Sequence, residues 1–350
     1  MSFFTTILSW VYGFFVGLRN LLYDEHLLHS AKLPIPTICI GNLSVGGTGK
    51  TPHTEFFARE LQQHYKVAVL SRGYRRKTRG FLLVDDNANA FTVGDEALQL
   101  HHNLPEVIVA VCENRVRGCR RLMRLFPDLE VILLDDGFQH RRLHCGFYVL
   151  LTAADNLFIH DHLLPHGRLR EHKMGSLRAN MVIVTKCPEK MQPIDKRVID
   201  TGLHLPPYQQ LFFSWLNYGQ LAPLQNNTEQ DIAPDAIRKP LLLTGIAQPQ
   251  PLIDYLKARY PQMETMRFAD HHRFTARDMQ HITKCYTSAC CDALITTQKD
   301  AMRLLAMPSL PPQWQSRCFV LPVQVDFHGE EKTVMQLLEN YIKENRRRKR

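Results

Sequence analysis

The sequence predicts an α/β fold in which a doubly wound, mostly parallel sheet is followed by a second, smaller α/β domain and preceded by a hydrophobic N-terminal helix. Six short apolar segments between residues 37 and 186 have the composition of strands buried on both faces. Amphipathic segments lie between several of them, and this alternation is typical of a parallel sheet with helices on its faces. With 350 residues, of which 45% are hydrophobic, the chain is long enough for two domains.

The first 22 residues, MSFFTTILSWVYGFFVGLRNLL, predict a helix with a wide apolar face. Its opposite face is small or weakly polar, with Thr6, Ser9, Gly13, Gly17 and Asn20. At 1.5 Å per residue such a helix is about 33 Å long, just enough to cross a bilayer. Three interpretations stay open: an interfacial anchor, a single membrane span and an ordinary buried helix. The first two would hold the protein at a membrane, and we assign residues 1–30 to a membrane-associated helix.

The first domain is predicted over residues 31–205. Its strands are the segments TICIG, KVAVLS, EVIVAVC, EVILLDD, GFYVLLT and MVIVTK, and helices are expected near residues 54–64 and 114–126. A proline-rich, polar stretch at residues 188–234 interrupts this rhythm. A second series then predicts a smaller α/β domain over residues 206–340, with strands KPLLLTG, ETMRF, DALITT and CFVLPVQV and helices near residues 251–259 and 276–289.

Basic charge is concentrated at the C-terminal end. The formal net charge is +9, and the last eight residues, KENRRRKR, contain six positive charges and one negative charge. We assign residues 341–350 to a basic tail, which is either a solvated end or a segment attracted to anionic lipids. No aromatic residues interleave with these arginines, so we expect no nucleic-acid binding. The nine cysteines form no CxxC pair, which fits a reducing compartment. We expect a monomer.

A glycine-rich turn, GNLSVGGTGKTP, lies between the first strand of the sheet and the first helix. In this context consecutive backbone N–H groups can turn toward an anion at the helix N-terminus, which is how a phosphate loop works. The predicted phosphate-binding residues are Gly46, Gly47, Thr48, Gly49, Lys50 and Thr51. Lysine can reach the β- and γ-phosphates and the threonine hydroxyl can bind Mg²⁺. The turn therefore predicts a fold of the P-loop NTPase type that binds a nucleoside triphosphate with Mg²⁺.

The loop is a variant of the usual motif. Ser44 stands where the common pattern has a glycine, and the turn is similar to the GGxGKT loop of one branch of these NTPases. That branch usually carries an extra lysine just before the glycine pair, at the position of Val45 here. We interpret Ser44 as a difference of subtype.

Acidic residues follow two further segments. The strand EVILLDD ends in Asp135 and Asp136, where the carboxyl ends of parallel strands face a ligand crevice, and this position suits Mg²⁺. A turn-forming Asp-Asp-Gly is the alternative. The segment VGDEA adds Asp95 and Glu96 at a predicted helix start, where they are either an N-cap pair or active-site acids. Phosphoryl transfer to an alcohol benefits from a carboxylate that orients the hydroxyl and takes its proton, and Asp95 is the candidate.

Eight segments in order closely resemble the tetraacyldisaccharide 4'-kinase family, the lipid A 4'-kinases of Gram-negative bacteria: GNLSVGGTGKTP, LSRGYRRK, VGDEA, ENR, DDGFQH, LLPHGRLRE, ADHHRF and TTQKDAMRL. The resemblance covers nearly the whole chain. It implies transfer of the γ-phosphate of ATP to the 4'-hydroxyl of a tetraacylated glucosamine disaccharide 1-phosphate at the cytoplasmic face of the inner membrane. It also implies two α/β/α domains with the active site in the cleft between them, and membrane binding through the N-terminal helix.

The same resemblance implies roles for individual residues. Asp95 is the expected catalytic aspartate, and His271 is its expected partner, with His272 as the competing residue. Arg115 matches a position near the transferring phosphate, although Arg117, Arg120 and Arg121 share its predicted helix. The expected polar site residues are Asp136, Gln139 and His140, and the expected metal ligands are Thr51, Asp135 and Glu96.

Three further features bear on the substrate, the loop geometry and the nucleotide. The basic loop SRGYRRKTRG is either solvated or binds the 1-phosphate or lipid head groups. Arg168 stands where the family more often has a second proline, which affects the expected loop geometry. Neither VTKCP nor TTQKDAM completes a guanine motif, so ATP rests on the resemblance. A membrane-associated partitioning NTPase and a metal-insertion GTPase remain the alternative classes.

Overall fold

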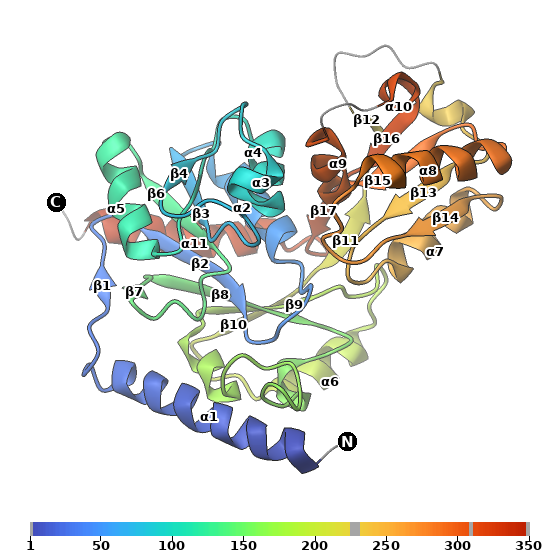
Figure 1. Ribbon diagram of the computed structural model, residues 1–350. Helices are drawn as coiled ribbons and strands as arrows, with labels where there is room; N and C mark the ends of the chain where they lie inside the picture. The colour runs from blue at the N-terminus through green and yellow to red at the C-terminus, as the bar shows by residue number, and fades with distance from the viewer. Residues whose placement is uncertain (1–2, 225–231, 308–310, 348–350) are drawn as a thin grey trace.

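The computed structural model describes residues 3–224, 232–307 and 311–347, which form two lobes, each built around its own sheet (Figure 1). The large sheet has the strand order β10-β9-β8-β2-β6-β3-β5-β4. All its neighbours pair in parallel except β4 with β5. The strands are β2 (Thr37–Asn42), β3 (Val67–Ser71), β4 (Leu82–Leu83), β5 (Ile108–Val111), β6 (Val131–Asp135), β8 (Phe147–Ala153), β9 (Met181–Thr185) and β10 (Gln210–Phe213).

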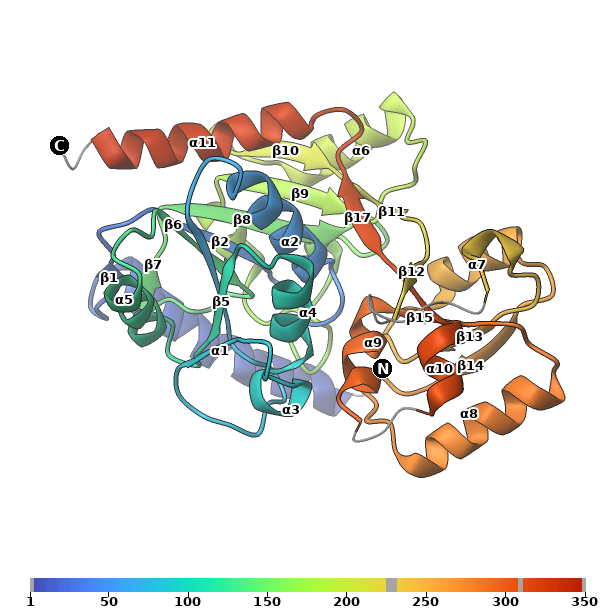
Figure 2. The same ribbon diagram turned by 90° about the horizontal axis from the view of Figure 1, so that it is seen from above.

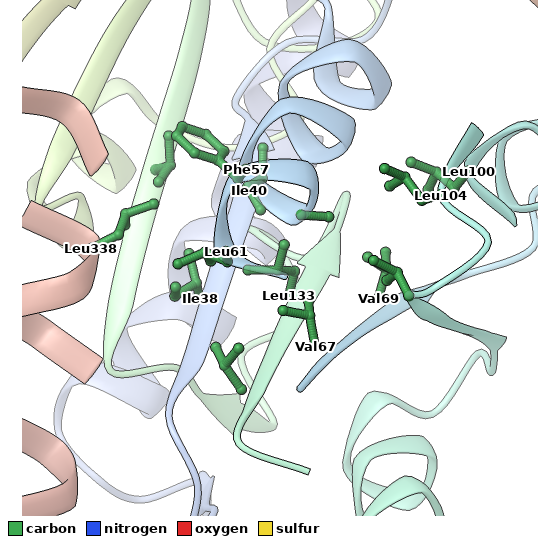
Figure 3. Close-up of a cluster of buried hydrophobic side chains, with 14 of the residues drawn as sticks. Ile38, Ile40, Phe57, Leu61, Val67, Val69, Leu100, Leu104, Leu133 and Leu338 are labelled. Atoms are coloured by element: carbon green, nitrogen blue, oxygen red, sulfur yellow. The ribbon is translucent and has the colours of Figure 1, made fainter. Parts of the chain in front are cut away.

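Helices cover both faces of this sheet, because successive side chains of a buried strand point to opposite faces. On one face Ile38 and Ile40 pack with α2 (Lys50–Leu61), α4 (Asp95–Asn103) and α11 (Glu331–Arg347), as Figure 3 shows. On the other face Cys39 packs in a cluster with α5 (Arg115–Leu125) and α6 (Pro193–Leu203). The six apolar segments predicted as strands are confirmed, and so is the α/β class with mainly parallel pairing.

The smaller lobe contains a five-stranded sheet with the order β12-β16-β15-β13-β14. Its strands are β12 (Ala222–Pro223), β13 (Leu241–Thr244), β14 (Glu264–Arg267), β15 (Leu294–Thr297) and β16 (Cys318–Leu321). One face carries α8 (Ala276–Ser288), α9 (Gln298–Leu305) and α10 (Pro312–Arg317), and the other carries α7 (Gln250–Arg259). Short elements complete the chain: β1 (Ala31–Lys32), α3 (Ala90–Val93), β7 (Leu143–His144), η1 (Phe158–His160), η2 (Lys173–Arg178) and η3 (Pro234–Ala236).

An antiparallel ribbon, β11 (Trp215–Tyr218) with β17 (Val323–Asp326), lies where the chain passes between the lobes (Figure 2). The smaller lobe does not coincide with the unit predicted over residues 206–340, because both ends of that unit belong to the large lobe. The strand β10 continues the large sheet by pairing with β9. The helix α11 returns to the large sheet, because Val334, Leu338 and Ile342 form an apolar stripe that is buried in the core of that sheet. This helix also includes residues 341–347 of the predicted tail, and residues 348–350 lie outside the described part.

The stretch at residues 188–234 is more structured than its composition indicated. It contains α6, β10, β11 and β12, although residues 225–231 lie outside the described part. Proline occupies the first turn of α6, where its missing N–H costs no helical hydrogen bond.

The N-terminal helix α1 (Phe3–Asp24) packs its polar face against the large lobe. Ser9 and Tyr12 donate to the carbonyl oxygens of Leu163 and Arg170, at 2.9 and 2.8 Å, and Asn20 donates to Glu171 at 2.9 Å. Large apolar side chains cover the outer face and are exposed: Phe4, Ile7, Leu8, Trp10, Val11, Phe14, Phe15, Leu18 and Leu21. Of the helices in the described residues, none has both the length and the apolar character needed to cross a bilayer.

Candidate active site

The glycine turn is built as an open cradle at the start of α2. Gly46 and Gly49 have φ angles of +112° and +82°, a region that suits glycine and strains other residues. Gly49 is the N-cap of α2, and among the described residues no side chain caps its first N–H groups. The first turn carries no acidic residue. The free N–H groups and the positive end of the helix dipole therefore favour an anion at this place.

The segment around Arg168 holds this turn in place. Val45 donates its N–H to the carbonyl oxygen of Arg168 at 2.7 Å, and Ser44 forms a bridge with Leu169. The N–H of Arg168 in turn donates to Oδ1 of Asp161 at 3.0 Å. A proline at position 168 has no N–H for this bond. The departure from the family's pattern is thus compatible with an ordered loop in this chain.

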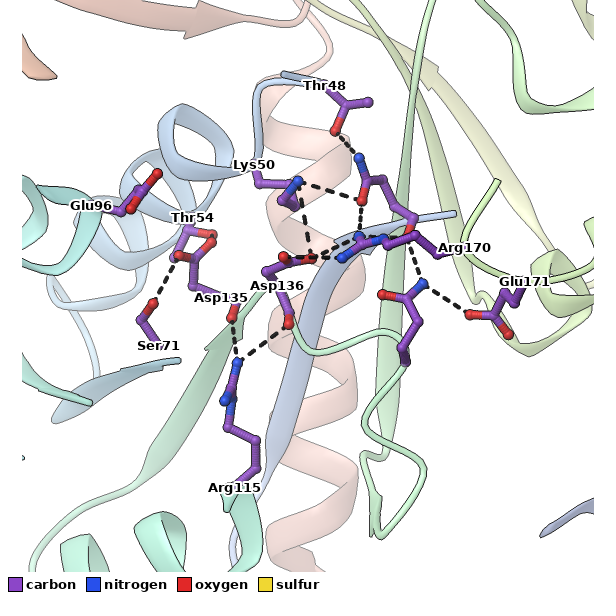
Figure 4. Close-up of polar contacts among 12 residues, drawn as sticks. Thr48, Lys50, Thr54, Ser71, Glu96, Arg115, Asp135, Asp136, Arg170 and Glu171 are labelled. Atoms are coloured by element: carbon purple, nitrogen blue, oxygen red, sulfur yellow. Dashed lines mark hydrogen bonds and ion pairs between the residues drawn. The ribbon is translucent and has the colours of Figure 1, made fainter. Parts of the chain in front are cut away.

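Lys50 points from the turn toward the carboxyl ends of β2 and β6 (Figure 4). Its Nζ lies 4.0 Å from Oδ1 of Asp136 and 3.4 Å from Oδ1 of Asn42. Asp136 also receives a bidentate pair from Arg170, at 2.8 and 3.2 Å. Burial alone would raise the pKa of Asp136, but Lys50 and Arg170 hold it at about 2. Burial lowers the pKa of Lys50.

Asp135 differs from its neighbour because no cation pairs with it directly among the described residues. It is buried at the end of β6 and accepts hydrogen bonds from the hydroxyls of Thr54 and Ser71, at 3.2 and 3.4 Å. Burial, together with the charges of Asp136 and Glu96, raises the pKa of Asp135 to about 6. A buried carboxylate without a partner charge is costly, so this position is suited to a cation.

No group of three or more His, Cys, Asp or Glu residues in the described part of the chain is arranged to hold a metal by itself. This agrees with the way Mg²⁺ is bound beside phosphates, where one or two protein ligands and the phosphate oxygens share the ion. Thr51 is buried at the start of α2, next to the residues of the turn. The donor set of Thr51 and Asp135 therefore fits Mg²⁺ that is shared with a nucleotide.

Asp95 and Glu96, the first two residues of α4, face the smaller lobe. Oδ2 of Asp95 lies 3.0 Å from Nδ1 of His271, in the loop after β14, and 2.7 Å from Nε of Arg303 on α9. Burial opposes ionisation of Asp95, but His271 and Arg303 lower its pKa on balance. Glu96 pairs with Lys299 at 3.0 Å, and this contact lowers the pKa of Glu96 against the effect of burial.

Arg303 is held in place by other residues of the smaller lobe. Its Nη1 donates to Oδ1 of Asp300 at 2.7 Å and to the carbonyl oxygen of Gly245 at 3.1 Å, while Asp300 itself is fully buried. Its Nη2 lies 3.2 Å from Nδ1 of His271. Nδ1 of His271 can accept from Arg303 only when it carries no proton and can donate to Oδ2 of Asp95 only when it carries one, so the two contacts cannot be hydrogen bonds at the same time. Arg303 thus fixes the Asp95 carboxylate from the opposite lobe.

The competing histidine has a different partner. Nε2 of His272 lies 3.1 Å from Oδ2 of Asp278, which also accepts from the backbone and hydroxyl of Thr275 in the capping box of α8. In this structure His271, and not His272, contacts Asp95.

Arg115 is buried and its guanidinium faces carbonyl oxygens. Nη1 donates to Cys112 at 2.9 Å and Nη2 to Asp136 at 3.3 Å, so the side chain ties the ends of β5 and β6 together. Its backbone N–H donates to Nε2 of His140 at 3.3 Å. Burial and the charge of Arg115 lower the pKa of His140 to about 4, so this histidine is neutral near pH 7 and accepts through Nε2.

Gln139 connects Asn42, in the glycine turn segment, to Glu171. Its Nε2 donates to the carbonyl oxygen of Asn42 at 2.8 Å and to Oε1 of Glu171 at 2.9 Å.

Several residues with direct contacts in this site were not singled out from the sequence, among them Asn42, Arg170, Lys299 and Arg303. Asn42 and Arg170 lie within two of the recognised segments, GNLSVGGTGKTP and LLPHGRLRE, and Lys299 and Arg303 lie within TTQKDAMRL. The signal that the sequence offered for these residues was that they lie within segments resembling the family. The pairings themselves join residues far apart in the chain, so no local pattern shows them.

Comparisons with known proteins identify the family of the chain as a whole. The family model described as tetraacyldisaccharide-1-P 4'-kinase, LpxK, matches residues 1–343. The tetraacyldisaccharide 4'-kinase of Bacteroides thetaiotaomicron is 43% identical over 97% of this chain and 93% of its own length. That of Flavobacterium johnsoniae is 40% identical over 96% and 95%. A crystal structure of the "apo" form of LpxK from Aquifex aeolicus in complex with ATP superimposes with a TM-score of 0.74, at 28% identity, over 96% of this chain and 98% of that one.

The motif-based resemblance is thereby confirmed, and it extends over both lobes and α1. The chain belongs to the tetraacyldisaccharide-1-phosphate 4'-kinase family.

Proposed function

We propose that this protein transfers the γ-phosphate of ATP to the 4'-hydroxyl of a tetraacylated glucosamine disaccharide 1-phosphate, a step of lipid A biosynthesis. Family membership supports the reaction. The observation in the structure that carries the proposal is the contact of Asp95 with His271, which brings a carboxylate and a histidine from opposite lobes together. The helix α4, which begins at Asp95, lies on the same face of the large sheet as α2, which begins at the phosphate loop, and Asn103 of α4 donates to Oε2 of Glu55 on α2 at 2.9 Å.

ATP and Mg²⁺ fit the residues that are present. Bound together, they supply the phosphoryl group and a divalent charge that neutralises the phosphate oxygens. The N–H groups at residues 46–51 and the ammonium of Lys50 bind the β- and γ-phosphates. Thr51 and Asp135 would hold the metal, and Glu96, which pairs with Lys299 at 3.0 Å in this structure, is the third proposed ligand. In this arrangement Arg115 holds Asp136 and His140 in position, and Gln139 holds the glycine turn through the carbonyl oxygen of Asn42.

Asp95 is the proposed catalytic base. Its lowered pKa keeps it ionised at neutral pH, so it can accept a hydrogen bond from the 4'-hydroxyl and take the proton as the phosphate bond forms. His271 and Arg303 orient the carboxylate and balance its charge. Because the pair with Arg303 also makes Asp95 a weaker base, much of its effect comes from aiming the hydroxyl, in line with phosphoryl transfer that depends mainly on positioning.

A location at the cytoplasmic face of the bacterial inner membrane is part of this proposal, and the outer face of α1 supports contact with a membrane. Trp10 is 78% exposed and Phe14 66% exposed, and such a large exposed apolar face is typical of a membrane or protein contact. In this proposal α1 lies in the interface, where the acyl chains of the acceptor are held. The basic residues at the end of α11 add attraction to anionic lipids. Nucleic acid has no role, and the protein acts as a monomer.

The deciding experiment is a transfer assay with purified ATP, Mg²⁺ and the acylated disaccharide 1-phosphate. We expect ATP turnover to require the acceptor and the product to carry a second phosphate at the 4' position. Rapid ATP hydrolysis without acceptor would instead support a partitioning NTPase, and a preference for GTP would support a metal-insertion GTPase. Either result would contradict the proposal.

A further inference from the structure

A fully buried histidine connects the phosphate turn with the base of the ribbon between the lobes. His53, in the first turn of α2, has no exposed surface, and neither has Ser214, the residue between β10 and β11. Nδ1 of His53 lies 2.7 Å from the carbonyl oxygen of Gly49, and Nε2 lies 2.9 Å from the hydroxyl of Ser214. The imidazole ring therefore joins the turn to a residue that is 161 positions away from it in the chain.

The surroundings of the ring fix the direction of both hydrogen bonds. A carbonyl oxygen can only accept, so Nδ1 carries the proton and donates to Gly49. Burial disfavours a second proton on the ring, so Nε2 accepts from the hydroxyl of Ser214. The two bonds thus form one chain, which runs from Ser214 through His53 to the turn.

The ribbon end of this chain is held firmly by the large lobe. Ser214 donates its backbone N–H to the carbonyl oxygen of Val184 on β9 at 2.8 Å, and its own carbonyl oxygen accepts from the N–H of Cys187 at 3.0 Å. The helix α2 lies beside β17 (Figure 2), and Phe327, which directly follows β17, is fully buried. The ring of His53 lies edge-on to that of Phe327, with 6.0 Å between the ring centres. Both strands of the ribbon therefore reach His53 at their large-lobe ends.

The bond from the ring to Gly49 adds to a bond that the helix already makes. The carbonyl oxygen of Gly49 also accepts from the backbone N–H of His53, at 3.1 Å. A second donor restricts how the peptide group between Gly49 and Lys50 can turn. Because a trans peptide is planar, its C=O and N–H point in opposite directions, so holding the carbonyl also fixes the N–H of Lys50. That N–H is the first of α2, at the end of the helix where an anion is favoured.

A core histidine that only satisfies its own hydrogen bonds is the plain explanation of this arrangement. We propose instead that His53 and Ser214 are positioning residues for the nucleotide. Ser214 holds the ring, and the ring holds the N–H of Lys50 toward the phosphates. A turn that is already arranged before binding gives a higher affinity than one that the ligand must order. The inference rests on the proposed function in one respect, namely that a nucleotide occupies the turn.

Two variants test the chain of bonds at its two ends. Ser214→Ala removes the hydroxyl, and His53→Leu removes the ring with both of its hydrogen bonds. The matched control is Thr296→Val on the smaller lobe, because the hydroxyl of Thr296 is also fully buried and donates to the carbonyl oxygen of Leu243 at 3.0 Å. Urea denaturation measures the free energy of unfolding, which should fall in all three proteins because each loses a buried hydrogen bond.

Calorimetric titration with a non-hydrolysable ATP analogue and Mg²⁺ measures the affinity of the turn. We expect Kd to rise about two- to tenfold in Ser214→Ala and by at least as much in His53→Leu, as the loss of one hydrogen bond implies. The double variant should bind no more weakly than His53→Leu alone, since the hydroxyl of Ser214 acts only through the ring. The control Thr296→Val should bind the analogue as the wild type does.

Steady-state transfer assays give a second measurement. The KM for ATP should rise with Kd, while kcat at saturating ATP stays within about twofold, because the held N–H serves the bound nucleotide and the transition state alike. Two results overturn the proposal. One is a Ser214→Ala protein that is less stable but binds the analogue like the wild type, which means a structural role only. The other is a fall in kcat with unchanged affinity.

The same measurements separate this inference from the proposed function. A wild type that binds the analogue but transfers no phosphate would contradict the proposed function, and the titrations would still decide the role of His53 and Ser214. A wild type that binds no nucleotide would overturn both.

Discussion

Asp95 and His271 are 176 positions apart in the chain, yet Oδ2 of the first lies 3.0 Å from Nδ1 of the second. Asp95 begins α4 on the large lobe, and His271 belongs to the loop between β14 and α8 on the smaller lobe. Each residue is fixed to its own lobe, so the contact forms only when the lobes have this relative position. The same interface contains the pair of Glu96 with Lys299. The proposed catalytic carboxylate is therefore held by contacts between the two lobes.

Replacing Asp95 with asparagine removes the base while keeping the size of the side chain. We expect kcat to fall by about 10²- to 10⁴-fold, the usual contribution of a positioned acid or base. Affinity for ATP should stay within a few-fold, because Asp95 is not part of the phosphate loop. Initial transfer rates and calorimetric titration with ATP measure the two quantities. The control is Asp86→Asn, since Asp86 is exposed on the surface and pairs with His101 at 3.1 Å. Equal loss of ATP affinity and kcat would contradict the assignment.

The pH dependence of the reaction should change when Arg303 is replaced by lysine. Burial raises the pKa of Asp95, and His271 and Arg303 outweigh it and lower the pKa. A lysine cannot reproduce the short contact from Nε, so the pKa of Asp95 should rise. Because Asp95 acts in its ionised form, the acidic limb of the plot of kcat/KM against pH should move to higher pH. An unchanged acidic limb with a uniformly lower rate would show that Arg303 has only a structural role.

Two neighbouring glycines of the turn should respond differently to alanine. Gly46 has a φ angle of +112°, whereas Gly47 does not lie in the left-handed region, and an added Cβ meets no atom within 4 Å at either position. The difference between the two variants therefore isolates backbone strain. We expect Gly46→Ala to lower the free energy of unfolding by about 1–3 kcal/mol. Gly47→Ala should change it by less than about 0.5 kcal/mol. Urea denaturation without nucleotide measures both, and equal losses would contradict the strain argument.

His53 should make the fold sensitive to acid. It is fully buried, its Nδ1 donates to the carbonyl oxygen of Gly49 at 2.7 Å, and its Nε2 accepts from the hydroxyl of Ser214 at 2.9 Å. Burial lowers the pKa of His53 from 6.5 to about 4. The folded protein thus binds this proton less readily than the unfolded chain. The contribution of neutral His53 to the free energy of unfolding is fully present above pH 6.5 and is lost as the pH falls toward 4. At pH 5 this loss is about 2 kcal/mol.

His53→Gln is the matching variant for this effect. It should be less stable than the wild type at pH 7 but lose less of its free energy of unfolding between pH 7 and pH 5. Part of the slope should remain, because the pKa of His140 is lowered to about 4 as well. Denaturation curves at several pH values measure the slopes. Parallel curves for the two proteins would exclude His53 as the source.

Local patterns predicted the parts of the site that a short segment can encode. The phosphate turn, Asp135 and Asp136 each follow a strand made of apolar residues, and the strands were found where those residues occur. Arg303 had no comparable signal. The chain contains 43 lysines and arginines, and what distinguishes Arg303 is a contact with a residue on the other lobe. Only the folded chain brings the two together.

The same reasoning explains the lobe boundaries. The helix α11 was not predicted, and residues 341–350 were assigned to a basic tail. Val334, Leu338 and Ile342 are spaced as on one face of a helix, but this spacing does not say which sheet the apolar stripe covers. In the structure it covers the large sheet, because the ribbon of β11 and β17 carries the chain back to it. Strand β10 was missed for a related reason: it is a four-residue segment after a polar stretch, and its place is set by pairing with β9.

The outer face of α1 gives the last prediction. Trp10 and Phe14 are exposed by 78% and 66%, whereas Ser9 and Tyr12 bind the large lobe. Each fully buried large apolar side chain contributes about 1.5–3 kcal/mol, so Trp10→Ser with Phe14→Ser should weaken binding to phosphatidylcholine vesicles by more than tenfold. Leu83→Ser on the edge strand β4 is the control, since Leu83 is also exposed but lies away from α1. Thermal unfolding should be unaffected, because the substituted side chains contact little of the protein. Unchanged vesicle binding would mean that this face meets something other than a lipid bilayer.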